Sequence, residues 1–238
     1  MEDKIQQFKQ LVNKCDNIVF FGGAGVSTES GIPDFRSKDG LYNQQYKYPP
    51  ETILSHTFFM NKTEEFFKFY KLKMNSLKYQ PNITHIKLSE LEAKGKLKAV
   101  ITQNIDGLHQ KAGSKVVYEL HGSVLRNYCM NCNKFYDAEY VFNSNGIPGC
   151  SCGGIIKPDV VLYEEGLDEE TIENSIYAIQ KADLLIVAGT SLTVQPASGL
   201  INFFRGRNLV LINRDSTPYD NKANLVINDS LGKVFSNL

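Results

Sequence analysis

Six short, mainly apolar runs separated by helical patterns constrain this chain of 238 residues most strongly. Continuous apolar runs bounded by turn formers are typical of strands that are buried on both faces of a sheet. Between some of these runs apolar residues recur at helical spacing, as at Ile172, Ile176 and Ile179. Strands that alternate with helices predict an open, mostly parallel α/β sheet of Rossmann-like form. The predicted strands cover residues 18–21, 98–101, 116–120, 184–188, 209–212 and 225–227.

Two stretches do not continue this alternation. Residues 45–80 are rich in aromatic side chains at mixed helical spacing, and residues 127–156 carry four cysteines among many turn formers. We expect a helical insertion over the first stretch and a small metal-bound insertion over the second, which together form a smaller lobe. The main domain then takes residues 1–44, 81–126 and 157–238, and it begins with an amphipathic helix.

The charge balance gives no reason to expect a nucleic acid or a membrane surface as a partner. The 26 basic side chains match the 26 acidic ones, so any such partner would need a local patch. No apolar run approaches the roughly 18–20 residues of a membrane-spanning helix. The polar first ten residues also lack the apolar stretch of a secretory signal. We therefore expect a cytoplasmic protein with no membrane partner and no nucleic-acid partner.

Four of the five cysteines form two closely spaced pairs, Cys129-x-x-Cys132 and Cys150-x-Cys152. Two such turns can place four thiolates tetrahedrally around zinc, and a four-thiolate site has no open position for water. The pattern predicts one structural Zn²⁺ that stabilises its lobe and takes no part in chemistry. The alternative is four unrelated buried cysteines. Cys15 ends the first predicted helix with no histidine nearby, so we expect a small core residue there.

A glycine-rich turn, Gly22-Gly23-Ala24-Gly25, follows the first predicted strand. Glycines at the start of a helix let backbone amides approach a phosphate, so a nucleotide or dinucleotide is the expected ligand. The dehydrogenase fingerprint is incomplete, because Thr28 stands where the third glycine belongs and no second strand ending in an acidic residue follows. An ordinary dehydrogenase is therefore disfavoured, and a plain tight turn stays open as an alternative.

Polar side chains follow several predicted strands at the carboxyl ends, where parallel sheets bind their ligands. Gln103, Asn104 and Asp106 come after the second strand, and buried groups of this kind need partners that a ligand can supply. His121 ends the next strand and could serve as a general base near neutral pH. A histidine in that place is also often a satisfied structural residue, and this interpretation stays open.

Seven stretches in matching order resemble the sirtuin family of bacterial type, the NAD-dependent protein deacylases. They are GAGVSTESGIPDFR (23–36), TQNIDGLHQKAG (102–113), ELHG (119–122), the cysteine quartet, KPDVVLYEE (157–165), GTSLTVQPA (189–197) and IN (212–213). The resemblance covers nearly the whole chain and implies a Rossmann-like domain with zinc-ribbon and helical insertions. It also implies that NAD is consumed and that nicotinamide, 2′-O-acyl-ADP-ribose and deacylated lysine are formed.

The resemblance assigns roles position by position. His121 would take a proton from the nicotinamide ribose, with Asn104 as a second catalytic residue, and Asp106 would hold the nicotinamide carboxamide. Gln103 and Ile105 would complete the nicotinamide pocket. The phosphate and nicotinamide-ribose region would comprise Gly23, Ala24, Gly25, Ser27, Thr28, Asp34, Phe35 and Arg36. The adenosine half would meet Gly189, Thr190, Ser191, Asn213 and Asp215.

The resemblance also places an acyl-lysine peptide against residues 160–163, with Val161 and Tyr163 as the contacts. Relatives commonly carry glycine where this chain has Glu164. Relatives that remove succinyl groups carry Tyr-x-x-Arg, and Tyr70-x-x-Lys73 stands in that place here. Lysine lacks arginine's fork for a carboxylate, so we expect deacetylation first. The alternative is that Tyr70 packs in the core and Lys73 is solvated.

Two other functions stay open at this stage. A mono-ADP-ribosyltransferase would use the same NAD pocket with a protein side chain as the acceptor. A zinc-ribbon module beside a nucleotide sensor would need a basic stripe. The ribbon region carries Arg126, Lys134 and Lys157, but acidic residues offset them, which disfavours the second alternative. These acidic residues are Asp137, Glu139 and Asp159.

Overall fold

A computed structural model describes residues 2–34, 40 and 46–238 of the chain. Its main domain is built on a six-stranded sheet in the order β3-β2-β1-β7-β8-β9, in which every neighbouring pair is parallel. All six predicted strands are present, so the expected parallel α/β sheet is confirmed. Their bounds are β1 (Ile18–Gly22), β2 (Leu97–Thr102), β3 (Val117–Glu119), β7 (Leu184–Ala188), β8 (Asn208–Ile212) and β9 (Leu225–Ile227).

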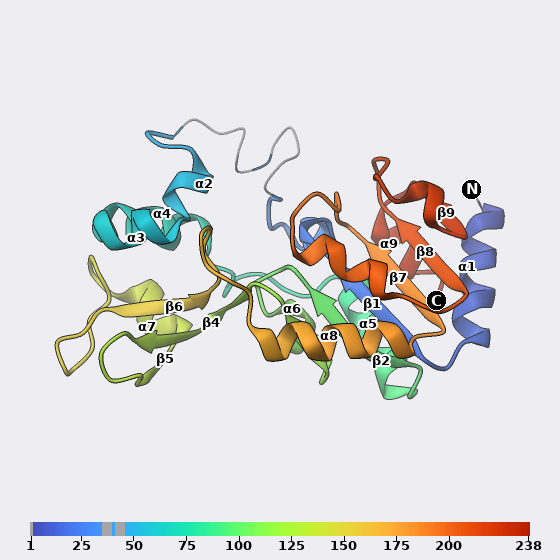
Figure 1. Ribbon diagram of the computed structural model, residues 1–238, viewed down its shortest axis with the longest axis horizontal. Coiled ribbons are helices and arrows are strands. Elements are labelled where there is room, and N and C mark those ends of the chain that lie inside the picture. Colours follow the sequence, from blue (N-terminus) through green and yellow to red (C-terminus); the bar gives the residue numbers. More distant parts are fainter. Residues whose placement is uncertain (1, 35–39, 41–45) are drawn as a thin grey trace.

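Helices cover both faces of this sheet (Figure 1), which explains why the central strands β1 and β7 are buried along their whole length. Ile18 and Phe20 of β1 point to one face and Val19 and Phe21 to the other, into two separate cores. The first core is completed by α1 (Glu2–Lys14), α5 (Ile83–Ala93) and α9 (Leu231–Phe235). The second is completed by α8 (Glu169–Lys181) and the 3₁₀ helix η4 (Ala197–Phe203).

The smaller lobe lies beside the main sheet (Figure 1) and has its own aromatic core. Phe58, Phe59, Phe66, Phe67 and Tyr70 pack there, so the aromatic stretch predicted to be helical forms this core. Its helices are α2 (Pro50–Ile53), α3 (His56–Asn61), α4 (Thr63–Lys73) and α7 (Ala138–Asn143). An antiparallel sheet in the order β5-β4-β6 joins them, with bounds β4 (Gly122–Cys129), β5 (Phe135–Asp137) and β6 (Ile156–Val160).

The small sheet extends on both sides of the cysteine-rich insertion expected over residues 127–156. Strand β4 begins at Gly122 and β6 continues to Val160. Because β4 starts directly after His121, one backbone crossing connects the main sheet to the small sheet. The lobes therefore meet at the candidate general base. None of the helices within the described residues is long and apolar enough to cross a membrane.

Two buried histidines predict a loss of stability in acid. The rings of His85, on α5, and His109, on α6 (Leu108–Lys111), lie 4.7 Å apart and are at most 1% exposed. Burial lowers the pKa of His85 to about 4, and burial together with His85 lowers the pKa of His109 well below its usual value. The unfolded chain, with histidine pKa values near 6.5, therefore binds more protons than the folded chain at mildly acidic pH.

The free energy of unfolding should fall as the pH falls from about 6.5 toward 4, by about 3 kcal/mol from His85 alone. Denaturant titrations at several pH values measure this slope. The variant His109→Phe removes one of the two titrating rings, the one that lies next to Phe20. The free energy of unfolding should then depend less steeply on pH. An equal slope in this variant and in the wild type would show that the pair does not govern acid stability.

Candidate active site

The glycine-rich turn packs against the loop that follows β7. The Gly25 N–H donates to the Gly189 carbonyl oxygen at 2.8 Å, and the Gly23 N–H donates to the Ala188 carbonyl oxygen at 3.3 Å. A Cβ on Gly25 would lie 2.8 Å from the Gly189 Cα, so only glycine lets the two loops touch. The turn leads into the short 3₁₀ helices η1 (Ala24–Val26) and η2 (Thr28–Ser30), which corrects the expected helix start.

Side chains from two strand ends meet beside this turn. The Ser27 hydroxyl donates to Asp106 Oδ2 at 2.6 Å, and the Asn104 amide donates to Ser27 Oγ at 3.1 Å. The Leu108 N–H donates to Asp106 Oδ1 at 2.9 Å. Burial raises the pKa of Asp106, while the bonds from Ser27 and Leu108 oppose that rise. The site thus holds a half-buried carboxyl group within a short polar network.

His121 lies in the short connection between the end of β3 and the start of β4. Its Nδ1 lies 2.9 Å from the Gln103 carbonyl oxygen. Because a carbonyl oxygen only accepts, Nδ1 carries the proton and the neutral ring keeps its lone pair on Nε2. Burial lowers the pKa of His121, although the bond to Gln103 opposes the shift, so the ring is neutral at pH 7. The Gln103 side chain in turn donates to Thr190 Oγ1 at 3.1 Å.

The residues predicted around NAD fall into two hydrogen-bonded groups, one residue that packs in the small lobe, and two that lie outside the described residues. One connected group joins the ends of β1, β2, β3 and β7, and contains Gly23, Gly25, Ser27, Gln103, Asn104, Asp106, His121, Gly189 and Thr190. A second group is held mainly by local contacts, with Thr28 bonded to Gly25, Ser191 to Thr193 and Asn213 to Asp215. Ile105 packs against the small-lobe core. Phe35 and Arg36 lie outside the described residues.

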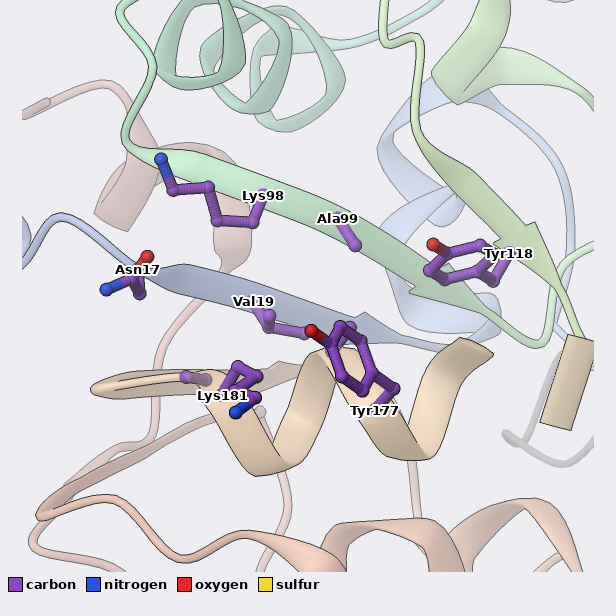
Figure 2. Close-up of a pocket in the computed structure, with 9 residues that line it drawn as sticks. Asn17, Val19, Lys98, Ala99, Tyr118, Tyr177 and Lys181 are labelled. Atoms are coloured by element: carbon purple, nitrogen blue, oxygen red, sulfur yellow. The ribbon is translucent and has the colours of Figure 1, made fainter. Parts of the chain in front are cut away.

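A surface cavity of about 400 Å³ lies between α8 and the face of the main sheet that this helix covers (Figure 2). It opens between α8 and the amino-terminal ends of the strands. Parallel sheets bind their ligands at the carboxyl ends, where His121 lies, so this cavity is not the candidate site. Its lining residues are Asn17, Val19, Lys98, Ala99, Tyr118, Tyr177, Ala178, Lys181 and Ala182.

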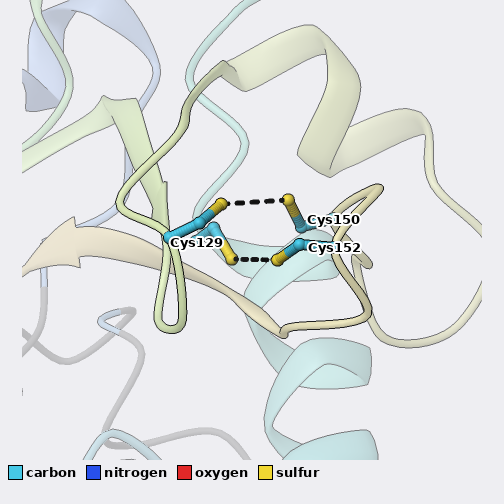
Figure 3. A group of neighbouring side chains, drawn as sticks. Cys129, Cys150 and Cys152 are labelled. Atoms are coloured by element: carbon cyan, nitrogen blue, oxygen red, sulfur yellow. Dashed lines mark hydrogen bonds between the residues drawn. The ribbon is translucent and has the colours of Figure 1, made fainter.

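The four paired cysteines converge at one end of the small sheet (Figure 3). The Cys129 and Cys152 sulfurs lie 3.4 Å apart, those of Cys132 and Cys150 lie 3.6 Å apart, and all four lie within 4.8 Å of one another. Zinc with four sulfurs at about 2.3 Å requires sulfurs roughly 3.8 Å apart, whereas a disulfide requires about 2.05 Å. The cluster therefore fits one structural zinc with no position left for water.

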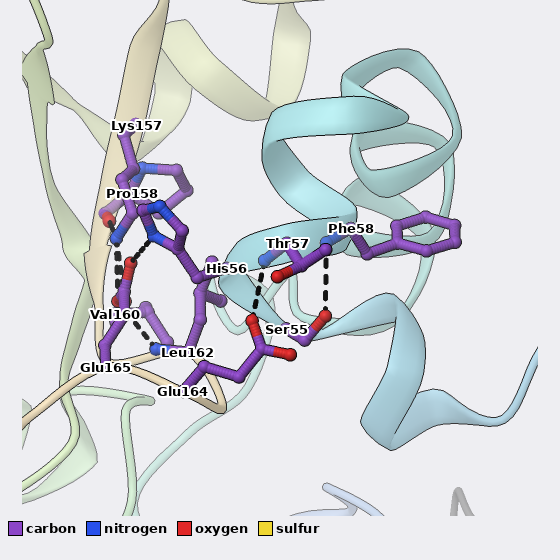
Figure 4. A network of polar contacts seen from close by, with 10 residues as sticks. All are labelled: Ser55, His56, Thr57, Phe58, Lys157, Pro158, Val160, Leu162, Glu164 and Glu165. Carbon is purple, nitrogen blue, oxygen red and sulfur yellow. Dashed lines mark hydrogen bonds and ion pairs between the residues drawn. The ribbon is translucent and has the colours of Figure 1, made fainter.

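The predicted peptide segment follows β6, and its neighbours Glu164 and Glu165 bond to the first turn of α3 (Figure 4). The Val161 N–H donates to the His121 carbonyl oxygen at 3.0 Å, and the Tyr163 N–H donates to the Leu54 carbonyl oxygen at 2.9 Å. Glu165 Oε1 contacts His56 Nδ1 at 2.8 Å, and Oε2 contacts Lys157 Nζ at 3.1 Å. The sequence did not predict these contacts, although Lys157 and Glu165 are the first and last residues of one of the matching stretches.

Glu164 adopts a backbone conformation that favours glycine. Its φ is +76°, which explains why glycine suits this position, and its carboxylate accepts the Thr57 N–H at 2.8 Å in the first turn of α3. Glu164→Gly should remove the backbone strain and the bond, whereas Glu164→Ala should remove the bond alone. We expect a lower melting temperature for the alanine variant than for the glycine variant, measured by calorimetry.

The matched control for this comparison is Glu173→Ala, because Glu173 is exposed on α8. Its melting temperature should remain close to that of the wild type. Equal melting temperatures for the Glu164 glycine and alanine variants would contradict the role of backbone strain at this position.

Tyr70 fills the core of the small lobe. Its side chain is fully buried and stacks on Phe66 and Phe142, and burial raises the pKa of its hydroxyl group. The Lys73 ammonium lies 5.5 Å from the centre of the Tyr46 ring. Tyr70 therefore packs in the core, as the alternative interpretation of the sequence expected. A role of Tyr70 and Lys73 in acyl choice stays a prediction.

The fold and the site together define a class of protein: a nucleotide-binding α/β domain joined to a zinc-binding lobe. The Sir2 family model matches residues 23–196. An NAD-dependent protein deacetylase of Clostridium acetobutylicum is 62% identical over 236 residues, which cover 98% of this chain and 96% of that protein. One of Clostridium perfringens is 61% identical over 238 residues, with 98% of each chain covered.

Solved structures give the same result. A Sir2 with a p53 peptide and NAD⁺ has a TM-score of 0.87 at 39% identity, covering 98% of this chain and 96% of its own. A Sir2 bound to acetylated peptide has a TM-score of 0.86 at 38% identity with the same coverage. The chain belongs to the Sir2 family, as the motif resemblance implied.

Proposed function

We propose that this protein is an NAD-dependent protein lysine deacylase that acts first on acetyl-lysine. The observation that carries the proposal is the His121 imidazole, which is neutral and has its Nε2 lone pair available at the carboxyl edge of the sheet. Relatives more than 60% identical, named NAD-dependent protein deacetylases, support it. The products would be nicotinamide, deacylated lysine and 2′-O-acyl-ADP-ribose.

The polar network fits the nicotinamide half of NAD. Asp106 and Asn104 are half-buried, so their side chains can bond a carboxamide without being fully solvated. In our proposal Asp106 holds that carboxamide, Gln103 and Ile105 line the pocket, and Asn104 acts beside the reacting sugar. When bound, NAD supplies the sugar carbon that the acyl oxygen attacks as nicotinamide leaves.

His121 would act as the general base for the same sugar. Its Nε2 accepts a proton from a ribose hydroxyl group, while Nδ1–H stays bonded to the Gln103 carbonyl oxygen and holds the ring. Activation of this hydroxyl lets it take over the acyl group. The loops around Gly189, Thr190 and Ser191 and around Asn213 and Asp215 would meet the adenosine half, as their place at the ends of β7 and β8 favours.

The peptide would lie along Val161 and Tyr163. Both lobes hold the backbone of this segment, through His121 and through Leu54, which supports its use as a template for an extended peptide. We propose no nucleic-acid partner, because Arg126 and Lys157 are engaged in ion pairs with acidic neighbours. The cytoplasmic location stays a prediction.

Incubation with NAD and a panel of otherwise identical acetyl, propionyl and succinyl peptides tests the proposal. We expect the acetyl peptide to be deacylated fastest, because Lys73 offers a succinyl carboxylate a point charge without a bidentate fork. Mass spectrometry follows each peptide. Loss of the succinyl group at a rate above that of acetyl would contradict this order. A peptide that gains the mass of ADP-ribose would favour a mono-ADP-ribosyltransferase.

A further inference from the structure

An ion-pair network lies beside His121 and belongs to none of the roles assigned above. Arg126, on β4, donates from Nη1 to Glu119 Oε2 at 2.6 Å and from Nε to Asp159 Oδ2 at 2.7 Å. Glu119 is the last residue of β3 in the main sheet, and Asp159 is on β6 in the small sheet. One guanidinium group therefore joins three strands and both lobes.

Of the two ion pairs of Arg126, the one with Glu119 constrains the position of the guanidinium group more strongly, because the Glu119 side chain is buried. The Glu119 side chain is only 7% exposed, while those of Arg126 and Asp159 are 38% and 41% exposed. A buried carboxylate requires a counter-charge, and within the described part of the chain Arg126 forms its only ion pair. The position of Arg126 on the small sheet is thus tied to the end of β3.

The backbone between these two contacts is the connection that carries His121. The Leu120 N–H donates to the Thr102 carbonyl oxygen in the main sheet, and the His121 carbonyl oxygen accepts the Val161 N–H from the small lobe. Gly122 has a φ of +74°, and a Cβ there would overlap the Asp159 carbonyl oxygen. A small shift of one sheet against the other would therefore move the His121 ring relative to the Gln103 carbonyl oxygen.

We propose that Arg126 is a positioning residue for His121, because it holds Glu119 and Asp159 at once and so sets the crossing from β3 to β4. The inference rests on the proposed function of His121 as the base. Arginine suits this task, since its planar group offers separate N–H edges to two carboxylates. The lysine ammonium is a single point charge on a flexible chain.

The test compares Arg126→Met, Arg126→Lys and Asp159→Asn with the wild type. We expect Arg126→Met to lower kcat about ten- to a hundredfold, with the KM for NAD changed less than about twofold, since misplacement of a reacting group by about 1 Å has effects of this size. Arg126→Lys should recover part of kcat. The exposed Arg207→Lys is the matched control, expected to keep the wild-type kcat.

A purely structural role predicts a different result. In that case Arg126→Met would lower the melting temperature but leave kcat and its pH profile unchanged below the transition. Our proposal predicts that the acid limb of the kcat profile moves to higher pH in Arg126→Met, because two carboxylates without their cation favour the protonated imidazole. Unchanged kcat and an unchanged profile in both Arg126→Met and Asp159→Asn would overturn it.

Nuclear magnetic resonance of the four histidines keeps the test independent of turnover. The His121 ring signals, assigned with His121→Gln, should titrate at higher pH than in the wild type in Arg126→Met, which loses a cation, and at lower pH in Asp159→Asn, which loses a carboxylate. Asp159→Asn retains the buried Glu119 pair and so should fold even if Arg126→Met does not. An inactive wild type would refute the proposed function, whereas an unshifted His121 titration in Asp159→Asn would refute only the role of Arg126.

Discussion

Replacing His121 with alanine is expected to lower the rate of deacylation by about two to four orders of magnitude, the usual contribution of a general base. The ring is held through Nδ1 by the Gln103 carbonyl oxygen, and its Nε2 is the group that we propose accepts the ribose proton. Alanine removes this acceptor and leaves the polar network of Ser27 and Asp106 in place. Peptide deacylation and NAD binding are measured on the same preparation.

His121→Asn is the matched control for shape. Its side-chain amide nitrogen takes the place of Nδ1 and can still donate to the Gln103 carbonyl oxygen, but it cannot act as a base at neutral pH. Both variants should therefore lose deacylation while they still bind NAD. Deacylation at the wild-type rate by either variant would refute the role of His121.

Removal of zinc is expected to unfold the small lobe and abolish turnover of the peptide. Structural zinc sites contribute about 10–16 kcal/mol of apparent binding free energy, which is comparable to the stability of a whole domain. The sulfurs of Cys129 and Cys150 lie at the edge of the aromatic core, so loss of the ion would open that core as well. Metal analysis, calorimetry and peptide turnover would follow treatment with a chelator.

Cys150→Ser tests the same site by mutation and should lose the zinc together with the small-lobe transition. Cys15→Ala is the control, because Cys15 is a buried residue of the main-sheet core and lies outside the cysteine cluster. It should retain one zinc per chain. A Cys150→Ser protein that keeps full turnover and the wild-type melting profile without zinc would contradict a structural role for the metal.

The main sheet was predictable because its pattern is local. The central strands β1 and β7 are buried along their whole length, and β1 shows why: alternate side chains enter two cores that helices cover on opposite faces. The cysteine pairs were equally predictable, because their spacing alone brings four sulfurs together. Both signals are carried by residues close in sequence.

The site could be predicted only in part, because its contacts join distant residues. Ser27 and Asp106 are 79 positions apart, and nothing in either segment alone indicates that they bond. The glycine turn was expected to start a helix, yet its Gly23 and Gly25 amides donate to the carbonyl oxygens of Ala188, at the end of β7, and of Gly189, which follows it. Glu119 and Asp159 lie within matching stretches, but only the structure shows that both reach Arg126.

The central claim is that the acyl group is transferred to the sugar of NAD. The most direct test is the mass of the nucleotide formed when the purified protein is incubated with NAD and an acetyl-lysine peptide. We predict acetyl-ADP-ribose in amounts equal to the nicotinamide and the deacetylated peptide. Free acetate with intact NAD, or a peptide that carries ADP-ribose, would contradict the account.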